Sequence, residues 1–596
     1  GYMVSYRRIG EDDSASHRKF YAYCVSYPDS GWYNNKCHID TLSKEAMDEF
    51  IRITYDAYNK CCGNEYGKTV PSMFSDEPQV AGFVPFRGKA LSEPARCTWT
   101  YDFDVTYKKT YSGDILDALP EIFFDMREFD EKPSKVRHNF FDHVAERFTT
   151  AFLDNCAARC EKDGLIFTGH VMGEGTIAEN TNFLGDCMRT YRRMQLPGVD
   201  MLCNQMEIES VKQCQSVVRQ YGREGMLSEL YGVTNYDFDF RGHKFQGDWQ
   251  AALGVTLRVP HLSWVSMEGN AKRDYPATIN YQAPWYKEYK YVEDHFARVN
   301  TVLTRGKALC NVAVINRIES FWIDYGPDYT SNDKNKKYNC HGFALPLTNT
   351  LLFNHIDFDY LSESLIPEQK TEVGKELRVG EMTYKTVIIC GNKTLRKTTA
   401  ELLINFAKAG GRVLIVGKAP EFIGCEKTPL LDELISLCEK VEDERYAILT
   451  ALKEEREVSI KRFDGTEVPE KLCQLRRDGD DTEYLFIANT SRAYCEGFTT
   501  SERLTISVKG EFIPYLLDTQ TGKVLTVDYR HENGSTVFGH DFFLSTSALF
   551  MLSRGEVNFA ETDDEKALCG KARRVDYRGA VGYETDNKNA LLLDLA

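Results

Sequence analysis

Over its first 300 residues the sequence repeats one order: a short apolar run, a few polar or aromatic residues, and then a stretch with helical periodicity. Three examples are Val-Pro-Ser-Met-Phe-Ser-Asp-Glu-Pro at 70–78, Leu-Ile-Phe-Thr-Gly-His at 165–170 and Gly-Met-Leu-Ser-Glu-Leu-Tyr-Gly at 225–232. Short strands that alternate with helices are typical of a parallel sheet with crossover helices. In a (β/α)8 barrel the residues that follow the strands share one face, where active sites lie. The pattern therefore predicts such a barrel, with its site at this face.

The strand count is about six, beginning with a predicted strand from Tyr21 to Tyr27. A helix is predicted next, because Ala46 and Phe50 begin an apolar series at helical spacing. A closed barrel needs eight strands, so we expect the chain to begin inside the barrel. Under that numbering Glu77 ends the fourth strand and Glu229 lies on the seventh, and the two positions face each other across the barrel top.

After the predicted barrel (1–305) the pattern changes twice. Residues 306–455 contain buried-type strands and a helix closed by Gly410-Gly411, which predicts a flavodoxin/amidotransferase-like α/β domain. Residues 456–560 alternate apolar and polar positions between turns, which predicts a β-sandwich. Residues 561–596 are predicted to be a linker and the start of a further domain.

Composition narrows the function further. The formal charge is −16 and no basic block occurs, so nucleic-acid binding is not expected. The apolar runs are far shorter than the roughly 20 residues of a membrane helix, so we expect no membrane association. Eighteen cysteines without a paired framework favour a reducing, cytoplasmic location. The chain opens on Gly1-Tyr2-Met3, however, so a signal peptide ahead of it stays open.

Two of the predicted strand ends offer a carboxylate, Glu77 and Glu229. Glycosidic bonds are cleaved by such a pair: one carboxyl group protonates the leaving oxygen, and the other attacks the sugar or activates water. We interpret Glu77 as the proton donor, with Asp76 beside it, and Glu229 as base or nucleophile. A proton donor at neutral pH needs a raised pKa, which the negative neighbours Asp76 and Glu229 can provide.

Five further residues are predicted to bind substrate at the same face. His170 and Glu174, in Gly-His-Val-Met-Gly-Glu, are interpreted as ligands of sugar hydroxyl groups or of a cation, and Glu174 also as an alternative to Glu229. Aromatic rings suit the C–H face of a sugar, which points to Tyr231, His261 and Trp264. For each of these, a purely structural role is the competing interpretation.

Other chemistries find little support in the sequence. No HExxH, no CxxC pair and no Gly-x-Ser-x-Gly is present, so zinc and acyl-transfer sites are not expected. Cys390 stands where an amidotransferase-like fold places its nucleophile, but the sequence beyond it lacks the Gly-x-Cys-x-Gly turn. We expect Cys390 to be buried and inert, and no cofactor to be required.

Ser-Asp-Glu-Pro at 75–78 and Ser-Glu-Leu-Tyr-Gly at 228–232 resemble the two catalytic strands of the large clan of (β/α)8 glycoside hydrolases. The order of the three domains is similar to that of family 42 β-galactosidases. The motifs at 76–78, 169–174 and 196–200 are closer to family 106, the α-L-rhamnosidases. The clan pattern has Asn before the acid/base Glu, whereas this sequence has Asp76, as family 106 members do.

The family 106 resemblance implies inversion with Glu77 as acid and Glu229 as base, and a calcium ion near the sugar, with Glu174 a candidate ligand. If the enzyme retains configuration, Glu229 becomes the nucleophile. The predicted function is an exo-acting glycoside hydrolase whose first candidate substrate is an α-L-rhamnoside and whose second is a β-D-galactoside. A catalytically inactive carbohydrate-binding barrel is the main alternative, and a lyase or isomerase on the same barrel is a third. A homo-oligomer is expected from the family 42 resemblance.

Overall fold

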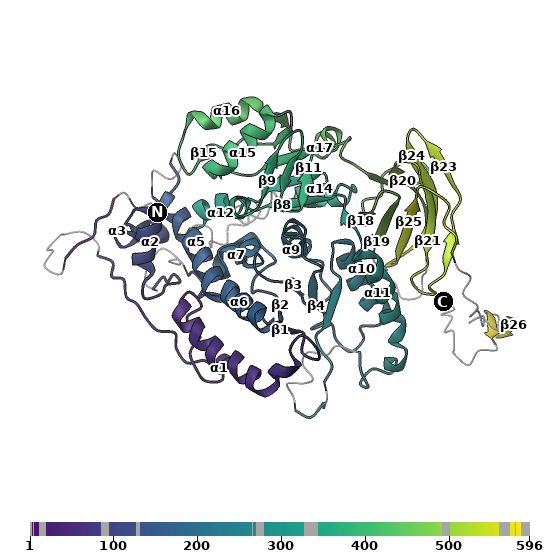
Figure 1. The fold of residues 1–596 in the computed structure, drawn as a ribbon, viewed down its shortest axis with the longest axis horizontal. Helices are drawn as coiled ribbons and strands as arrows, with labels where there is room; N and C mark the ends of the chain where they lie inside the picture. The colour runs from purple at the N-terminus through teal and green to yellow at the C-terminus, as the bar shows by residue number, and fades with distance from the viewer. Residues whose placement is uncertain are drawn as a thin grey trace.

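The structure is a computed structural model that describes residues 3, 5–10, 19–84, 94–126, 132–264, 266–269, 279–326, 344–491, 501–559, 572–577 and 580–585. An α/β barrel, a flavodoxin-like α/β domain and a β-sandwich follow one another along the chain, which confirms the predicted fold class. In Figure 1 the second domain, in green, lies above the purple-to-teal barrel, and the yellow sandwich lies to one side. No helix within the described ranges is both long enough and apolar enough to span a bilayer.

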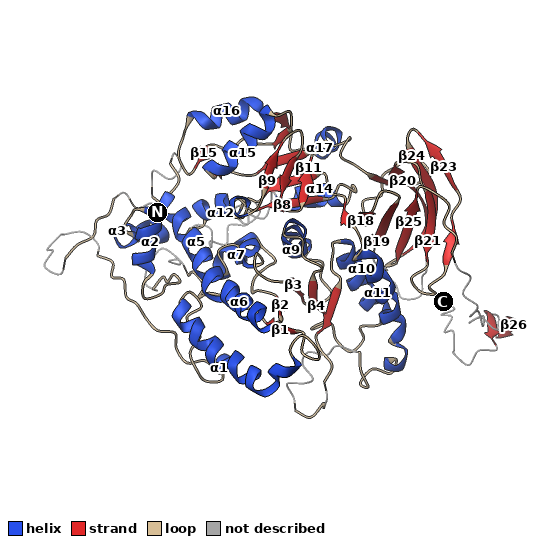
Figure 2. Ribbon diagram, viewed as in Figure 1, coloured by secondary structure: helices blue, strands red, loops and turns tan. Residues whose placement is uncertain are grey.

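The barrel sheet contains five described strands, all parallel and in chain order. They are β1 (Ser72–Ser75), β2 (Ile166–Gly169), β3 (Leu196–Met201), β4 (Leu227–Leu230) and β5 (Leu257–Pro260). Two strands separate β1 from β4, which is the spacing predicted for the strands that carry Glu77 and Glu229. Parallel strands need crossover helices, and Figure 2 shows helices around the sheet.

The helices of the barrel region range from ones that bury a single side to ones in which nearly every residue is buried. They include α1 (Lys44–Cys62), α2 (Phe103–Tyr111), α3 (Ile115–Ala118), α4 (Pro120–Phe123), α5 (Lys135–Phe148), α6 (Asp154–Asp163), α7 (Ile177–Phe183), α8 (Cys187–Thr190), α9 (Ile208–Gln220), α10 (Phe240–Ala252) and α11 (Lys290–Leu303). A π-helical turn, Thr149–Leu153, joins α5 to α6. Ser134 starts α5 by accepting a hydrogen bond from the Arg137 amide, and Gly164 ends α6 with φ +71°.

The predicted strand at Tyr21 to Tyr27 is wrong. This segment has no regular secondary structure, and Tyr21, Tyr23 and Val25 are 72%, 78% and 84% exposed. A strand needs a neighbouring strand for its backbone groups and an apolar surface for its side chains. The Tyr and Val residues have β propensity, but neither requirement is met here.

Gly169 allows β1 and β2 to lie close together at the face where the predicted site begins. Its φ is +124°, and a Cβ atom there would lie 2.0 Å from the Ser75 carbonyl oxygen. Only glycine fits a position with this dihedral and this approach. The next residue on each strand, Asp76 and His170, is therefore brought to the same edge.

The second domain is a parallel five-stranded sheet with the order β16-β14-β12-β7-β8. Its strands are β7 (Val312–Ile315), β8 (Phe358–Leu361), β12 (Thr386–Cys390), β14 (Arg412–Val416) and β16 (Glu439–Val441). The helices α12 (Ile318–Asp324), α14 (Ala344–Leu352), α15 (Lys397–Lys408), α16 (Pro429–Leu437) and α17 (Arg445–Ala451) connect or flank them. Numbered along the chain this is the order 2-1-3-4-5 of flavodoxin-like folds, as predicted.

The third domain packs two antiparallel sheets against each other. One is formed by β17 (Val458–Lys461), β20 (Ser501–Lys509), β24 (Ser535–Phe543) and β23 (Tyr529–Glu532). The other is formed by β22 (Val524–Thr526), β21 (Ile513–Leu517), β25 (Ser547–Ser553), β19 (Thr482–Asn489), β18 (Lys471–Asp478) and β6 (Lys307–Ala308). Ile460, Leu485 and Phe550 are fully buried between them. The edge strand β6 precedes the second domain, so the sandwich draws one strand from outside the predicted range 456–560.

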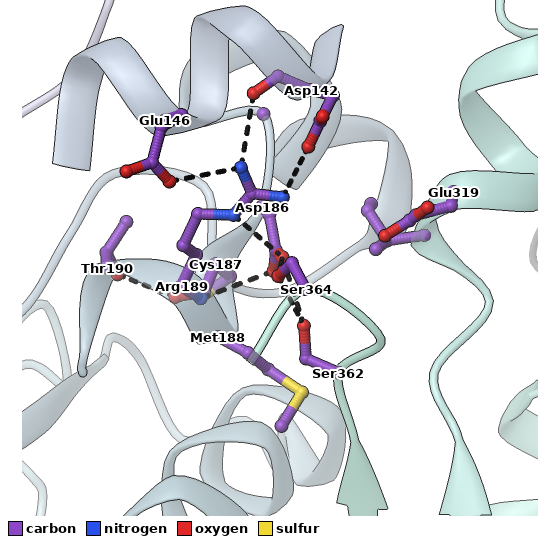
Figure 3. A network of polar contacts seen from close by, with 12 residues as sticks. Asp142, Glu146, Asp186, Cys187, Met188, Arg189, Thr190, Glu319, Ser362 and Ser364 are labelled. Carbon is purple, nitrogen blue, oxygen red and sulfur yellow. Dashed lines mark hydrogen bonds and ion pairs between the residues drawn. The ribbon is translucent and has the colours of Figure 1, made fainter. Parts of the chain in front are cut away.

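A buried network of ion pairs within the barrel extends through hydrogen bonds to the second domain, as Figure 3 shows. Arg189 of α8 donates to Asp142 of α5 over 2.8 Å. Asp186, the residue that caps α8, accepts hydrogen bonds of 3.2 Å from Ser362 and Ser364 of the second domain. Buried charges of this kind are tolerated when each is paired and hydrogen-bonded. The carboxyl groups and the guanidinium here meet that condition.

Candidate active site

The carboxyl ends of the five barrel strands each place a titratable side chain at one edge of the sheet. Asp76 and Glu77 follow β1, His170 follows β2, Asp200 and Glu229 lie on β3 and β4, and His261 follows β5. Asp200 and Glu229 are register partners on adjacent parallel strands, so their side chains project from the same side of the sheet. Carboxyl groups therefore outnumber histidines at this edge of the described barrel.

His170 lies at the centre of this group. Its Nε2 atom lies 2.8 Å from Glu229 Oε2 and 3.7 Å from Asp76 Oδ1. Burial by itself lowers the pKa of this imidazole, but the hydrogen bond to Glu229 and the charges of Glu174 and Asp200 outweigh it and raise the pKa to about 9. The side chain is 1% exposed. His170 is therefore a buried cation that orients the Glu229 carboxylate. Its burial argues against the predicted direct contact with a sugar.

Glu77 has a strained backbone and a raised pKa. Its φ of +45° is a left-handed conformation that residues other than glycine rarely adopt, and such conformations concentrate at functional sites. The pKa of the half-buried carboxyl group is raised mainly by burial, with Asp76 and Glu229 adding to the shift and His170 opposing it. The sequence analysis attributed the raised pKa to the negative neighbours alone, whereas burial contributes more than they do.

Asp200 is a member of the site that the sequence did not identify. Its pKa is raised to about 7, first by burial and then by the charges of Glu229, Glu77 and Asp76, against the opposing effect of His170. The signal was present in Leu-Pro-Gly-Val-Asp at 196–200, because this strand lies between the strands of His170 and Glu229. An acidic residue at such a strand end is as strong a candidate for the site as Glu229.

Glu174 is an internal support. It is 4% exposed, and its Oε1 atom accepts hydrogen bonds from the Tyr191 hydroxyl (2.8 Å) and the Val171 amide (3.3 Å). Its Oε2 atom accepts from the Asp200 amide at 2.9 Å. Both carboxylate oxygens are thus used to hold the ends of β2 and β3. A carboxylate that is occupied in this way does not fit the predicted role of a calcium ligand or of a second catalytic carboxylate.

Asp76, His170 and Glu229 form the one cluster of potential metal ligands in the described part of the chain, with ligand atoms within 4.8 Å of one another. The set contains a ring nitrogen, whereas calcium is bound by six to eight oxygen atoms. The nitrogen also bonds to Glu229 as a cation would. The cluster is therefore better described as a histidine neutralised by carboxylates.

The three rings that were predicted to contact the sugar, Tyr231, His261 and Trp264, differ in how close they lie to the carboxyl groups. Tyr231 is fully buried, donates its hydroxyl hydrogen to the His243 carbonyl (3.1 Å) and accepts from Arg258 (3.0 Å), so it supports the barrel from inside and cannot stack on a sugar in this structure. His261 is at the site, 25% exposed, with Nε2 4.0 Å from Glu229 Oε1. Trp264 lies in the loop after β5, partly buried, and its predicted sugar contact stays a prediction.

A cavity of about 60 Å³ lies away from these carboxyl groups, between α7 and α9 of the barrel and the ends of β7 and β12. Glu209, Arg317 and Cys390 are among the residues that line it. The hydroxyl groups of Thr348 and Tyr360 already bind Glu209. Burial raises the pKa of the Cys390 thiol to about 12, so this cysteine is unreactive, as its sequence context indicates.

Comparison with known structures addresses the fold. The chain aligns with a rhamnosidase from Novosphingobium sp. PP1Y at a TM-score of 0.67 and 16% identity, over 91% of this chain and 50% of that one. It aligns with the exo-carrageenase GH42 from Bacteroides ovatus at 0.55 and 12%, over 87% and 71% of the two chains. For Gan42B, a GH42 β-galactosidase from G. stearothermophilus, the values are 0.54 and 11%, over 86% and 82%.

The chain has the fold of these glycoside hydrolases. It spans about half the length of the rhamnosidase. No protein-family model matches the sequence, and no curated protein sequence matches it significantly. At these identities the likeness concerns the backbone, so the reaction has to be argued from the side chains.

Proposed function

We propose that the protein is an exo-acting glycoside hydrolase that removes a terminal sugar. The observation that carries this proposal is the contrast between the two carboxyl groups at the ends of β1 and β4. Burial and negative neighbours favour the protonated form of Glu77, whereas Glu229 is paired over 2.8 Å with a histidine that is cationic at neutral pH. One carboxyl group whose surroundings favour its protonated form and a second that is ion-paired with a cation are what general acid/base hydrolysis of a glycoside requires.

In this mechanism Glu77 gives its proton to the glycosidic oxygen as the bond to the leaving group breaks. The Glu229 carboxylate then either attacks the anomeric carbon or removes a proton from the attacking water. The ion pair with His170 fixes the orientation of Glu229. In this mechanism Asp76, which is largely exposed beside Glu77, contacts the sugar. The anomer that is released first, followed by NMR, distinguishes attack by Glu229 from attack by water.

The first candidate substrate that we propose is an α-L-rhamnoside, and the second is a β-D-galactoside. The motifs at strands β1 to β3 and the alignment with the rhamnosidase support the former. The domain order and the alignments with the GH42 enzymes support the latter. The proposed partner is thus a carbohydrate. An oligomer and a cytoplasmic location stay predictions.

A panel of aryl glycosides tests the proposal. We expect the purified protein to release the aryl group from at least one member, and Glu229→Gln to reduce kcat/KM by roughly 10³-fold or more, since both routes require this carboxylate. The matched control is Glu224→Gln, an exposed carboxylate just before β4, which should keep the wild-type rate.

The inactive carbohydrate-binding barrel makes a different prediction. In that case no glycoside is hydrolysed, while L-rhamnose or D-galactose still binds in a calorimetric titration, equally to wild type and Glu229→Gln. Equal hydrolysis rates in wild type and Glu229→Gln would instead remove Glu229 from the mechanism.

A further inference from the structure

Asp200 is a third carboxyl group in the site, and the acid/base mechanism does not use it. It lies on β3, directly opposite Glu229 in the register of the two parallel strands. Its backbone amide is held by Glu174, so the strand end that carries it is fixed. The side chain is only partly buried, which leaves one side of the carboxyl group open to the site.

Asp200 forms no ion pair of its own within the described part of the chain. The charge of His170 is shared by Glu229 at 2.8 Å and Asp76 at 3.7 Å. Among the described residues, no Lys, Arg or His nitrogen lies within 4.0 Å of the Asp200 carboxyl group. A partly buried carboxylate next to other carboxylates and without its own cation favours the protonated form. The pKa of about 7 agrees with these surroundings.

The same carboxyl group lacks hydrogen-bond partners. Asp200 Oδ1 is buried, and no described residue bonds to it. Buried polar atoms of native proteins nearly always have a partner, a water molecule included, so the unpaired Oδ1 shows that no described side chain competes for this carboxyl group.

We propose that Asp200 works as a neutral carboxyl group that hydrogen-bonds a hydroxyl group of the bound sugar beside Glu229. This inference rests on the proposed glycosidase function. The carboxyl group exchanges a hydrogen bond with the sugar through Oδ2, the oxygen that is not buried, and no covalent bond changes. The role is to position the sugar, and it adds no further negative charge to a site that already contains Asp76 and Glu229.

Two substitutions separate this role from that of an ionised base. Asparagine has the size of aspartic acid and keeps one donor and one acceptor, so Asp200→Asn should retain kcat/KM at pH 6 within roughly fivefold. Asp200→Ala loses the hydrogen bond to the sugar, and its kcat/KM at pH 6 should fall by roughly 10- to 100-fold. Between pH 6 and pH 8.5 wild type should lose activity relative to Asp200→Asn, because only wild type ionises at this position. A drop in kcat of roughly 10³-fold for Asp200→Asn would overturn the proposal in favour of an ionised base.

Infrared spectroscopy tests the protonation without turnover. At pH 6 the wild-type protein should show a protonated-carboxyl C=O band that is missing from Asp200→Asn and that disappears at pH 8.5. The matched control is Asp432→Asn, an exposed carboxylate on α16, which should leave the band unchanged. If Asp200→Asn and wild type have the same spectrum at pH 6, Asp200 is ionised and the proposal fails.

Calorimetric titration with L-rhamnose and with D-galactose tests the contact itself. We expect Asp200→Asn to bind the preferred sugar as wild type does and Asp200→Ala to bind roughly tenfold more weakly, with folding of each variant checked by circular dichroism. Equal affinity of wild type and Asp200→Ala would overturn the sugar contact. Because binding and infrared bands do not need hydrolysis, an inactive protein would contradict the proposed function while these experiments still decide the role of Asp200.

Discussion

The barrel sheet and the five-stranded sheet of the second domain are both parallel, and their carboxyl ends differ in how far their ionisable groups are open to solvent. At the barrel edge, Asp76, Asp200 and Glu229 surround one imidazolium, and Asp76 is largely exposed. At the edge of the second sheet, Asn316 accepts a hydrogen bond from the Ile318 amide, and Glu363, which follows β8, is 1% exposed although burial and Glu319 raise its pKa to about 8. Ligands of open parallel sheets bind at this edge. The comparison shows that a position at the carboxyl edge of a parallel sheet is not sufficient to make a ligand site. At the barrel edge, negative carboxyl groups also outnumber the one imidazolium beside them.

The same contrast appears in the titrating groups. Glu77 and Asp200 have raised pKa values that bring proton exchange toward neutral pH. Cys390, at the corresponding position of the second domain, has a pKa of about 12 and is not exchangeable at neutral pH. The titrating groups of the barrel edge are partly exposed, whereas Cys390 and Glu363 at the second edge are buried, so we expect proton transfer with a substrate at the barrel edge.

The largest effect that sharpens this comparison is expected from Glu77. Glu77→Gln should reduce kcat/KM by roughly 10²- to 10⁴-fold on aryl glycosides with poor leaving groups, because these need protonation of the glycosidic oxygen. With strongly acidic phenols the loss should shrink, and the slope of log kcat/KM against leaving-group pKa is the measurement. A loss that is independent of the leaving group would argue against Glu77 as the acid.

A smaller, structural effect is expected at the domain interface, where charges are paired. Arg189→Met leaves Asp186 buried without its cation, whereas Asp142 keeps Arg396 at 2.7 Å, and breaking a buried pair in this way costs about 3–5 kcal/mol. Urea unfolding should show the decrease in the free energy of unfolding. Arg241→Met removes an exposed pair on α10 and serves as the control, with a change of about 0–1 kcal/mol. Equal changes in the two variants would mean that the buried network around Arg189 does not stabilise the protein.

The pH dependence of stability tests the charge of His170. Its pKa is about 9 in the folded protein, against 6.5 for an unperturbed imidazole. A raised pKa contributes stability that is complete below the unfolded value and is lost as the pH rises through the folded value. We therefore expect Tm to fall between pH 6.5 and about 9 in wild type and to fall less steeply in His170→Gln. Parallel profiles for the two proteins would contradict a cationic His170.

The smallest effect is expected at the second sheet. Cys390→Ala should change kcat/KM by less than about twofold, and thiol-directed reagents should not modify Cys390 in the folded protein, because a thiolate is required for reaction. Mass spectrometry after alkylation checks the second point. Loss of activity in Cys390→Ala at unchanged stability would assign chemistry to the edge that we regard as structural.

The sequence was sufficient for the order of the domains and for the strand ends of the barrel. Short apolar runs followed by polar residues predicted β1, β2 and β4 and placed Glu77 and Glu229 at one edge, because these patterns depend on local spacing. The flavodoxin-like domain was predicted for the same reason, without its strand order. The prediction of a strand at Tyr21 to Tyr27 failed, since whether a β-prone segment pairs depends on distant parts of the chain.

Side-chain direction at the strand ends could not be predicted. Tyr231 turns inward because its φ is +75°, and Glu174 turns inward because Tyr191 and two backbone amides bind it. Neither the dihedral angle nor these partners is visible in the local sequence. Asp200 was missed for a related reason, since its raised pKa comes from burial and from acidic residues at two other strand ends.

The two-residue strand β6 has a consequence for how the chain folds. It sits between the barrel and the second domain, yet its partner is β18 of the sandwich, and the nearby Arg476 side chain binds the Arg305 carbonyl 171 residues earlier in the chain. Closing a loop of that length costs entropy before the contact stabilises anything, so such pairings slow folding. We expect the sandwich to complete its edge only after the second domain has formed. A chain ended before β18 would leave β6 unpaired and the exit of the barrel loose.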